Sequence, residues 1–449
     1  MQNITINRQT SQVKNGEIST LALSVEYPHV SKKLLLMFCG YVIIWYLQLG
    51  YRWPSLGAVR FEFIYAAALT VLAFLATPKF DNQCPLLPYI LLYFIVIVIQ
   101  VPLSSDFDTS WEVFVDRIIK FSFMAFFIMS FVRSPTHMKY FLAAFLLACL
   151  KMGEEGLVGK ITGGLIWMNQ GIMRLHGATP LYAHPNSFSG MALGTLPFVY
   201  YFWPLSNRYI RIILLAIGLL SLNILIFTGS RTGYVGFFVF LLCIISSSKN
   251  KKIFIMSLLV AGILTVSIIP SDYIGRFDSI FTEHDKEGAS IEARKEILSD
   301  AWQIFKEHPL GIGVAAFPKV RMEKFGRYQD THNLYFEIAT NLGIQGLIVV
   351  SLLIYKIITT LKQVRKSARE CIDLTINAGN ARFQSITEDL KFIEAVASAT
   401  ITFVIIRLAL GLFGMDMYEI YWWFAIGITF STYSMMRRIR IYMQSQLAE

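Results

Sequence analysis

Long apolar blocks constrain this chain more than any other feature of its sequence. Two of them, residues 86–103 (LLPYILLYFIVIVIQVPL) and 253–270 (IFIMSLLVAGILTVSIIP), each run for 18 residues without a charged side chain. About 18 consecutive apolar residues indicate a helix that crosses a bilayer. A soluble domain would have no core large enough to bury such helices on every side. We therefore expect an all-α polytopic membrane protein.

The composition agrees with this class. Of the 449 residues, 55% are hydrophobic and 16% are charged, and the mean hydropathy is +0.53; soluble domains carry about 25% charged residues. The net charge of +10 could indicate a nucleic-acid partner, but the basic cytoplasmic loops of a membrane protein supply such an excess by default. We therefore expect no nucleic-acid partner. The five cysteines include no CxxC pair, which predicts neither a disulfide framework nor a zinc site.

The apolar blocks divide the chain into about twelve predicted spans. Their approximate limits are 34–50, 61–77, 86–103, 117–132, 139–152, 187–204, 210–227, 232–247, 253–270, 333–355, 393–413 and 417–436. The first block follows Ser31-Lys32-Lys33 and a polar segment, so we expect a retained first span and not a cleaved signal peptide. The predicted regions are an N-terminal tail (1–33), spans one to nine (34–270), a long outer loop (271–332), spans ten to twelve (333–436) with a long inner connection (356–392), and a C-terminal tail (437–449).

The orientation follows from the distribution of Lys and Arg, which are enriched in cytoplasmic loops. With the N-terminus inside, the short inner connections and the C-terminal tail carry eleven such residues and the shorter outer loops carry five. The segment 106–116 (DFDTSWEVFVD) is purely acidic and falls outside. We therefore predict that both termini are cytoplasmic and that the 271–332 loop lies outside.

This outer loop contains a predicted amphipathic helix. Apolar residues recur at helical spacing in IEARKEILSDAWQIFKEH, which follows Ser290. We expect Ser290 to be the N-cap, Glu292 to lie in the first turn, and Pro309 and Gly311 to end the helix. The helix either covers the outer mouth of the bundle or rests on the membrane surface.

Three short polar segments interrupt the apolar pattern, and the predicted topology puts all three outside. They are residues 174–186 (RLHGATPLYAHPN), 228–233 (TGSRTG) and 331–335 (THNLY). The second is a tight turn between two spans, and it holds the Arg231 guanidinium among free backbone N–H groups. Such donors suit a phosphate or diphosphate. The alternative is an arginine that extends to lipid head groups.

Histidines in these segments are candidates for proton transfer. His332 follows the structured loop directly and begins a span, and an imidazole with a pKa near 6.5 can take a proton from a hydroxyl. The alternative is an interfacial histidine that caps its helix. We expect His184, beside Pro185, to shape a helix start.

Several basic residues are predicted in the outer half of the bilayer. Ionisable groups at that depth usually face a cavity. With Asp116 and Glu62 neutralising part of the charge, they would form a basic chamber for a polyanionic lipid head group. Its members would be Arg60, Arg117, Lys120, Arg174, Arg231 and Arg407.

The ordered motifs resemble the bacterial O-antigen ligase and polymerase superfamily. They are R-x-x-G followed by HPN (residues 174–186), the SRT turn with its following glycines (230–236), HPLGIG (308–313) and HNLYFEIATNLGIQG (332–346). The resemblance covers roughly residues 170–350, and one departure is His184, where asparagine is as frequent.

The resemblance implies a GT-C-like membrane glycosyltransferase whose site faces the periplasm of the bacterial inner membrane. The donor would be an undecaprenyl-diphosphate-linked glycan, and the acceptor a sugar hydroxyl on lipid A–core or on a second lipid-linked glycan. Arg174 and Arg231 would bind the donor diphosphate without a metal or cofactor, and His332 would act as base. The possible supporting residues are Arg60, Arg117, Lys120, His184, Asn186, Asn333, Tyr335 and Arg407.

Other functions stay open at this point. Ligase and polymerase share the donor and the site, and the sequence does not decide between them. About twelve spans also fit a flippase or a secondary transporter, although such proteins tend to show repeated halves, which are not visible here. A purely structural membrane protein is a third possibility.

Overall fold

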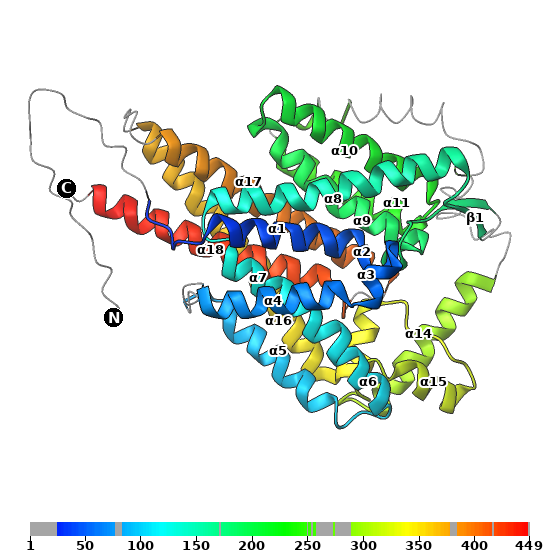
Figure 1. Ribbon diagram of the computed structural model, residues 1–449. Coiled ribbons are helices and arrows are strands. Elements are labelled where there is room, and N and C mark those ends of the chain that lie inside the picture. The colour runs from blue at the N-terminus through cyan, green and yellow to red at the C-terminus, as the bar shows by residue number, and fades with distance from the viewer. Residues whose placement is uncertain are drawn as a thin grey trace, which may run out of the picture.

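The computed structural model describes residues 25–76, 83–169, 172–248, 250–252, 255–256, 273, 289–377, 384–414 and 417–447. Helices running side by side along one long axis make up most of these residues (Figure 1). The main elements are α1 (Lys32–Leu47), α2 (Leu49–Arg52), α3 (Pro54–Ala58), α4 (Phe61–Ala76), α5 (Leu87–Gln100), α6 (Phe107–Val113), π-helix η1 (Phe114–Ile119), α7 (Lys120–Phe131), α8 (Pro135–Thr162), β1 (Ile166–Asn169), β2 (Ile172–Leu175), η2 (Pro180–Tyr182), α9 (Pro185–Phe202), η3 (Trp203–Leu205), α10 (Arg208–Phe227), α11 (Arg231–Ser247), α14 (Ala289–Glu307), α15 (Phe317–Phe325), α16 (Leu334–Asn377), α17 (Gln384–Leu410) and α18 (Ile420–Leu447).

Every predicted span except 253–270, most of which lies outside the described residues, coincides with a helix. In the described part of the chain, α10, α16 and α17 are long and apolar enough to cross a membrane. The α4, α5 and α11 helices are apolar but shorter. These findings support the all-α membrane class, while the number of spans stays a prediction.

Local sequence signals explain where the helices begin. A side chain at the N-cap accepts a hydrogen bond from the backbone of the first turn in α8 (Ser134), α9 (His184), α10 (Asn207) and α11 (Ser230). Proline follows the cap in α8 and α9, where its missing N–H group costs nothing. The prediction that His184 shapes a helix start is therefore confirmed.

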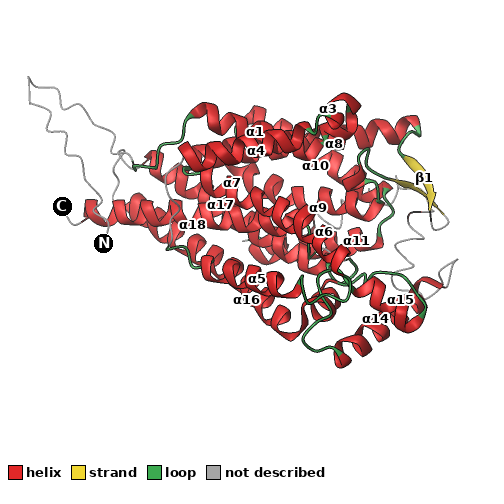
Figure 2. Cartoon of the chain, turned by 60° about the horizontal axis from the view of Figure 1, so that its bottom comes forward, coloured by secondary structure: helices red, strands yellow, loops and turns green. Residues whose placement is uncertain are grey.

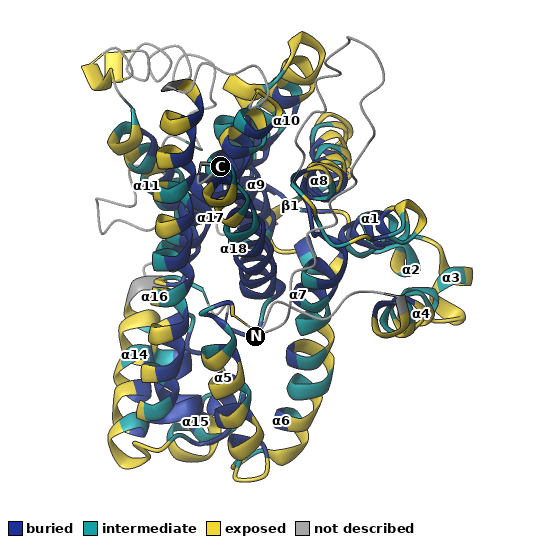
Figure 3. Ribbon diagram, turned by 90° about the vertical axis from the view of Figure 1, so that its left-hand side faces the viewer, coloured by how far each residue is buried: buried dark blue, intermediate teal, exposed yellow. Residues whose placement is uncertain are grey.

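The core is an aromatic cluster around α18. The Phe424 ring, 1% exposed, lies 4.9–6.1 Å from ring centroids on three neighbouring helices. Its partners are Phe141 and Phe145 of α8, Phe198 of α9 and Phe403 of α17. Figure 3, seen along the helices, shows α17 and α18 as buried elements near the centre. Rings in such offset and edge contacts hold the four helices in one arrangement.

The bundle has two distinct ends. At one end, which we call the loop end, lie α2, α3, α6, the β-strands, α14 and α15; α1 begins and α18 ends at the other, the terminal end (Figures 1 and 2). The strands form an antiparallel hairpin with Trp167 opposite Arg174. The all-α prediction misses this hairpin, because residues 153–186 read from sequence only as a connection.

The predicted long inner connection at 356–392 is mostly helical. The α16 helix continues to Asn377, and α17 begins at Gln384. The two helices bury an apolar seam that includes Leu361, Val364 and Leu390. Charged residues on their outer faces interrupted the apolar pattern, which is why the sequence indicated a loop.

The outer-loop helix forms a small subdomain at the loop end. The α14 helix begins at Ala289, so the prediction that Ser290 is its N-cap is wrong, whereas Glu292 lies in the first turn and the helix ends before Pro309 as expected. Its buried face packs on α15 and the start of α16. The first part of the predicted 271–332 loop, residues 271–288 apart from Tyr273, lies outside the described residues.

A break in α16 joins this subdomain to the bundle. Gly343 has φ 69° and ψ −167°, which interrupts the helix. The freed backbone pairs with the HPLGIG segment: Ile312 N donates to Thr340 O at 3.0 Å, and Ile344 N donates to Pro309 O at 2.9 Å. A β-carbon on Gly343 would lie 2.6 Å from the nitrogen of Gly311. The two glycine motifs therefore pack directly against each other.

We expect Gly343→Ala to lower the thermal unfolding temperature of the detergent-solubilised protein more than Gly326→Ala does. Both glycines have φ near 70°, but nothing lies within 4 Å of a β-carbon added at Gly326. The Gly326 substitution should cost only the left-handed strain, about 1–2 kcal/mol. Equal losses in the two variants would contradict the close backbone packing at Gly343.

Candidate functional site

A buried arginine joins two of the three polar segments at the loop end. Arg174 of β2 is 2% exposed. Its Nε donates to the carbonyl of Thr228 at 2.8 Å, and its Nη2 donates to Asn186 Oδ1 at 3.0 Å. Ser230 Oγ donates to the same Asn186 oxygen at 2.8 Å. The sequence therefore correctly placed segments 174–186 and 228–233 together.

This network fixes the N-terminus of α11. Ser230 Oγ also accepts from Gly233 N at 3.0 Å, so the serine both caps the helix and contacts Asn186. Arg231 is the first residue of α11 and is partly exposed. Arg231 thus follows a turn whose backbone is held from two sides, at a helix N-terminus, where backbone N–H groups favour negative charge.

His332 of the third polar segment is close enough to His184 for its charge to affect the pKa of that residue. Burial lowers the pKa of His184, and the nearby charges of Arg174 and His332 lower this pKa further. Burial also lowers the pKa of His332, although Asp330 opposes the effect. Both shifts favour the neutral imidazole at pH 7, and an imidazole can accept a proton only in that form.

The backbone around His332 is held by its neighbours. His332 has φ 47°, which is unusual for a residue with a β-carbon. Asn333 Oδ1 accepts from the backbone nitrogens of Tyr335 and Phe336 at 3.0 and 3.1 Å, and its Nδ2 donates to Leu412 O at 3.1 Å. The cap of α16 is therefore Asn333, so the alternative that His332 caps its helix is wrong.

Tyr335 has a similar supporting position. Its hydroxyl donates to the carbonyl of Leu408 at 3.0 Å, which ties the first turn of α16 to the end of α17. Asn333 and Tyr335 thus hold the segment that carries His332.

Arg117 lies on a π-helical turn near this segment. Its Nη1 donates to Glu419 Oε1 at 2.6 Å, and its charge lowers the pKa of Asp330, which burial raises. Such π-turns frequently occur at functional sites. Arg117 is therefore within electrostatic reach of Asp330.

Arg407 lies inside the bundle, where its guanidinium contacts residues of α9 and α18. It is 3% exposed, its Nη2 donates to Gly190 O at 2.8 Å, and its guanidinium carbon is 3.3 Å from the centre of the Tyr421 ring. Gly194 leaves the space that the guanidinium fills, since an added β-carbon would lie 3.3 Å from Nη2. These contacts describe an arginine that joins α9, α17 and α18.

Two other members of the predicted chamber, Lys120 and Arg60, are exposed. Lys120 pairs with Asp116, one of the two acidic residues expected to neutralise part of the charge, and both are exposed. Glu62 accepts a hydrogen bond from Gly50 N at 2.9 Å, and Arg60 is exposed between α3 and α4. Neither Lys120 nor Arg60 is brought to His332, so their roles stay predictions.

Three residues near His332 were missed from the sequence. Arg294 of α14 lowers the pKa of His332, Asp330 raises it, and Gln329 touches the imidazole at 3.4 Å. Asp330 could have been found from the sequence, because it lies only two positions from His332. Arg294 could not be found, because its closeness depends on how α14 packs.

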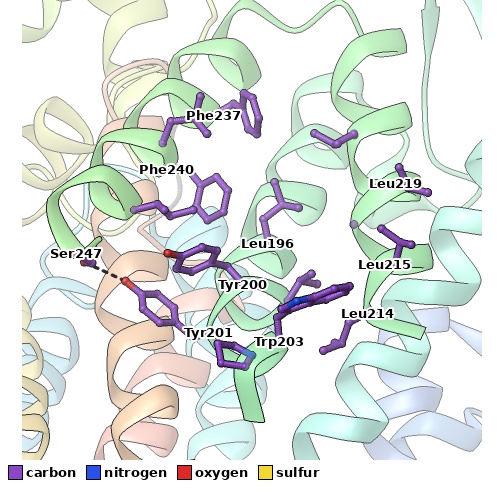
Figure 4. A pocket seen from close by; sticks show the side chains of 16 residues that line it. Leu196, Tyr200, Tyr201, Trp203, Leu214, Leu215, Leu219, Phe237, Phe240 and Ser247 are labelled. Carbon is purple, nitrogen blue, oxygen red and sulfur yellow. Dashed lines mark hydrogen bonds between the residues drawn. The ribbon is translucent and has the colours of Figure 1, made fainter. Parts of the chain in front are cut away.

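An apolar cavity lies away from these polar groups. It has a volume of 580 Å³ and is lined by apolar side chains of α9, α10 and α11, among them Leu196, Leu219 and Phe240 (Figure 4). One of its few polar contacts is the hydrogen bond between Tyr201 and Ser247 at 3.2 Å. The helices α10 and α11 that line it are joined by the turn before Arg231.

The fold and the site define an α-helical membrane protein with a polar, arginine-containing site at one end of its bundle. Residues 215–351 match the family described as O-Antigen ligase. The match supports the resemblance to the O-antigen ligase and polymerase superfamily. It includes Arg231 and His332 but begins after segment 174–186. No curated protein sequence matches the chain.

We expect Ser230→Ala to destabilise the solubilised protein by about 1 kcal/mol, the usual cost of losing an N-cap side chain. The reason is that Gly233 N loses its acceptor and Asn186 loses one donor. Thermal unfolding would measure the effect. Ser246→Ala, on the exposed far end of α11, is the control; an equal decrease in both variants would contradict the role of the cap.

Proposed function

We propose that this protein is an inverting, metal-independent glycosyltransferase that acts at the periplasmic face of the inner membrane. It transfers a glycan from an undecaprenyl-diphosphate-linked donor to a sugar hydroxyl of the acceptor. Two observations support the proposal: the Ser230–Asn186 hydrogen bond joins the turn before Arg231 to segment 174–186, and His332 affects the pKa of His184 in that segment. Arg231 and His332 both lie within the residues that match the family.

Each group has a step in the proposed reaction. The acceptor hydroxyl oxygen forms a bond to the anomeric carbon of the donor while the bond from that carbon to the diphosphate breaks. His332 takes the hydroxyl proton. Arg231 and the N-terminal amides of α11 stabilise the charge on the departing diphosphate, as a divalent ion would in other enzymes.

Arg174 supports the diphosphate site mainly by holding the backbone of the turn before Arg231 in place. Its guanidinium is buried and donates to Thr228 and Asn186, so it holds the turn from which Arg231 extends. Its positive charge also lies close enough to lower the pKa of His184. Arg174 therefore contributes both the shape and part of the electrostatic potential of the site.

The apolar cavity fits a lipid-linked donor. A diphosphate held at Arg231 lies at the turn between α10 and α11, and these helices line the cavity with α9. An isoprenoid chain attached to that diphosphate would run along the same helices into the hydrocarbon region. This arrangement favours a polyprenyl carrier over a soluble nucleotide sugar.

We expect Arg231→Ala to reduce transfer by roughly 100-fold, the usual effect of removing one group that stabilises a developing charge. His332→Ala should reduce transfer by roughly 100-fold or more, because no base remains. Purified protein would be incubated with the polyprenyl-diphosphate-linked glycan and an acceptor, and the products separated by gel. Arg231→Lys should retain part of the activity.

The matched control is Arg208→Ala. Arg208 is also the first residue of a helix, follows a capping side chain and is exposed, but it begins α10 at the other end of the bundle. Full activity of both Arg231→Ala and His332→Ala would refute the mechanism.

We expect the transfer rate to be constant above pH 6.5 and to decrease only at lower pH. His332 is a base only while neutral, and its folded pKa is lowered from 6.5, so the acidic limb must lie below that value. Rates measured from pH 4.5 to 8 would locate the limb. A limb above pH 7 would contradict the assignment of His332 as the base.

The same assay separates the remaining possibilities. Product formed on lipid A–core indicates a ligase, and product formed on a second lipid-linked glycan indicates a polymerase. In vesicles, movement of the donor across the bilayer without a new linkage would indicate the alternative, a flippase or transporter.

A further inference from the structure

Gln329 lies in the connection between α15 and α16 and contacts the proposed base. Its Nε2 is 3.4 Å from Nε2 of His332. Its Oε1 accepts a hydrogen bond from Nη1 of Arg321 at 3.5 Å. The side chain thus bridges an arginine and the imidazole.

The arginine in this bridge is itself fixed. Arg321 of α15 is 1% exposed, and its Nε donates to Asp300 Oδ2 of α14 at 2.9 Å. This buried ion pair sits beside the apolar contacts between the two helices. Breaking such a pair leaves an uncompensated charge, so the guanidinium has one strongly preferred position.

The donors and acceptors of these groups then determine the protonation of His332. Arginine can only donate, so the Gln329 atom that faces Arg321 must be the carbonyl oxygen. The amide nitrogen consequently faces the imidazole, and it can only donate. His332 Nε2 must therefore accept, which leaves the proton of the neutral ring on Nδ1.

We propose that Gln329, oriented by the Arg321–Asp300 pair, is a positioning residue that keeps Nε2 of His332 unprotonated and ready to act as the base. This inference rests on the proposed function, because it concerns the nitrogen that receives the acceptor proton. A protonated ring would bring two N–H groups together at Nε2, so the Gln329 amide also opposes formation of the imidazolium. The acceptor hydroxyl takes the place of the amide when it binds.

Other charges around His332 also affect the protonation of its imidazole. Asp330, on the same connection, favours the imidazolium, whereas Arg294 of α14 and Arg321 of α15 oppose it. His184 at the start of α9 is affected by His332 in turn. Gln329 differs from all of these because it contacts one particular ring nitrogen, and it is exposed enough to be replaced without disturbing the core.

The test is the pH profile of transfer in Gln329→Glu and Gln329→Ala. A carboxylate at this position accepts from Nε2–H and stabilises the imidazolium, so the acidic limb of Gln329→Glu should move up by about one pH unit. Gln329→Ala removes only the opposing amide, so its limb should move in the same direction by less. Gln384→Glu introduces the same charge at the terminal end and should leave the profile unchanged.

The outcomes separate this inference from the proposed function. An unchanged limb in Gln329→Glu, with His332→Ala inactive, would overturn the role of Gln329 and leave the base intact. A shift of equal size in Gln384→Glu would also overturn it. Activity retained in His332→Ala would instead refute the proposed function. Thermal unfolding of each variant verifies that the fold is preserved.

Discussion

The interrupted backbone at Gly343 is the constraint on which the loop end depends. An unbroken α16 would satisfy its own N–H and C=O groups and would have none to offer to the HPLGIG segment. Because the helix breaks there, the backbone of Pro309 and Ile312 forms hydrogen bonds with the backbone of α16, as neighbouring β-strands do. This pairing fixes the end of α14 and the start of α15 relative to α16. Only glycine adopts this backbone conformation routinely.

Elements defined by a long apolar pattern could be predicted from the sequence. Features that depend on contacts between distant parts of the chain could not. Apolar blocks located the helices to within a few residues in most cases, because burial in a bilayer demands an unbroken apolar surface. The polar segments around Asn186 and Ser230 could be grouped, since the alternation of spans brings their ends to one side. The β-hairpin, Arg294 and the Arg321–Asp300 pair had no such pattern. Their positions result from tertiary packing of residues distant in the chain.

The two arginines predicted for one role have different surroundings. Arg174 is buried and donates to a backbone carbonyl and an amide oxygen, so much of its hydrogen-bonding capacity serves the fold. Arg231 begins a helix and is partly exposed. Sequence alone treats both as fork donors facing an anion, because the difference lies in a hairpin that it did not reveal. In the proposed site both arginines supply positive charge, Arg174 would fix the shape of the site, and Arg231 would contact the ligand.

The length of α16 has a consequence for the opposite side of the membrane. From Gly343 to Asn377 the helix extends about 50 Å at 1.5 Å per residue, whereas the hydrocarbon layer is about 30 Å thick. Several turns must therefore stand in water, paired with the first turns of α17 through Leu361, Val364 and Leu390. The chain thus carries a stiff two-helix stalk continuous with its membrane bundle, so a force applied to the stalk would be transmitted along α16 as far as the break at Gly343.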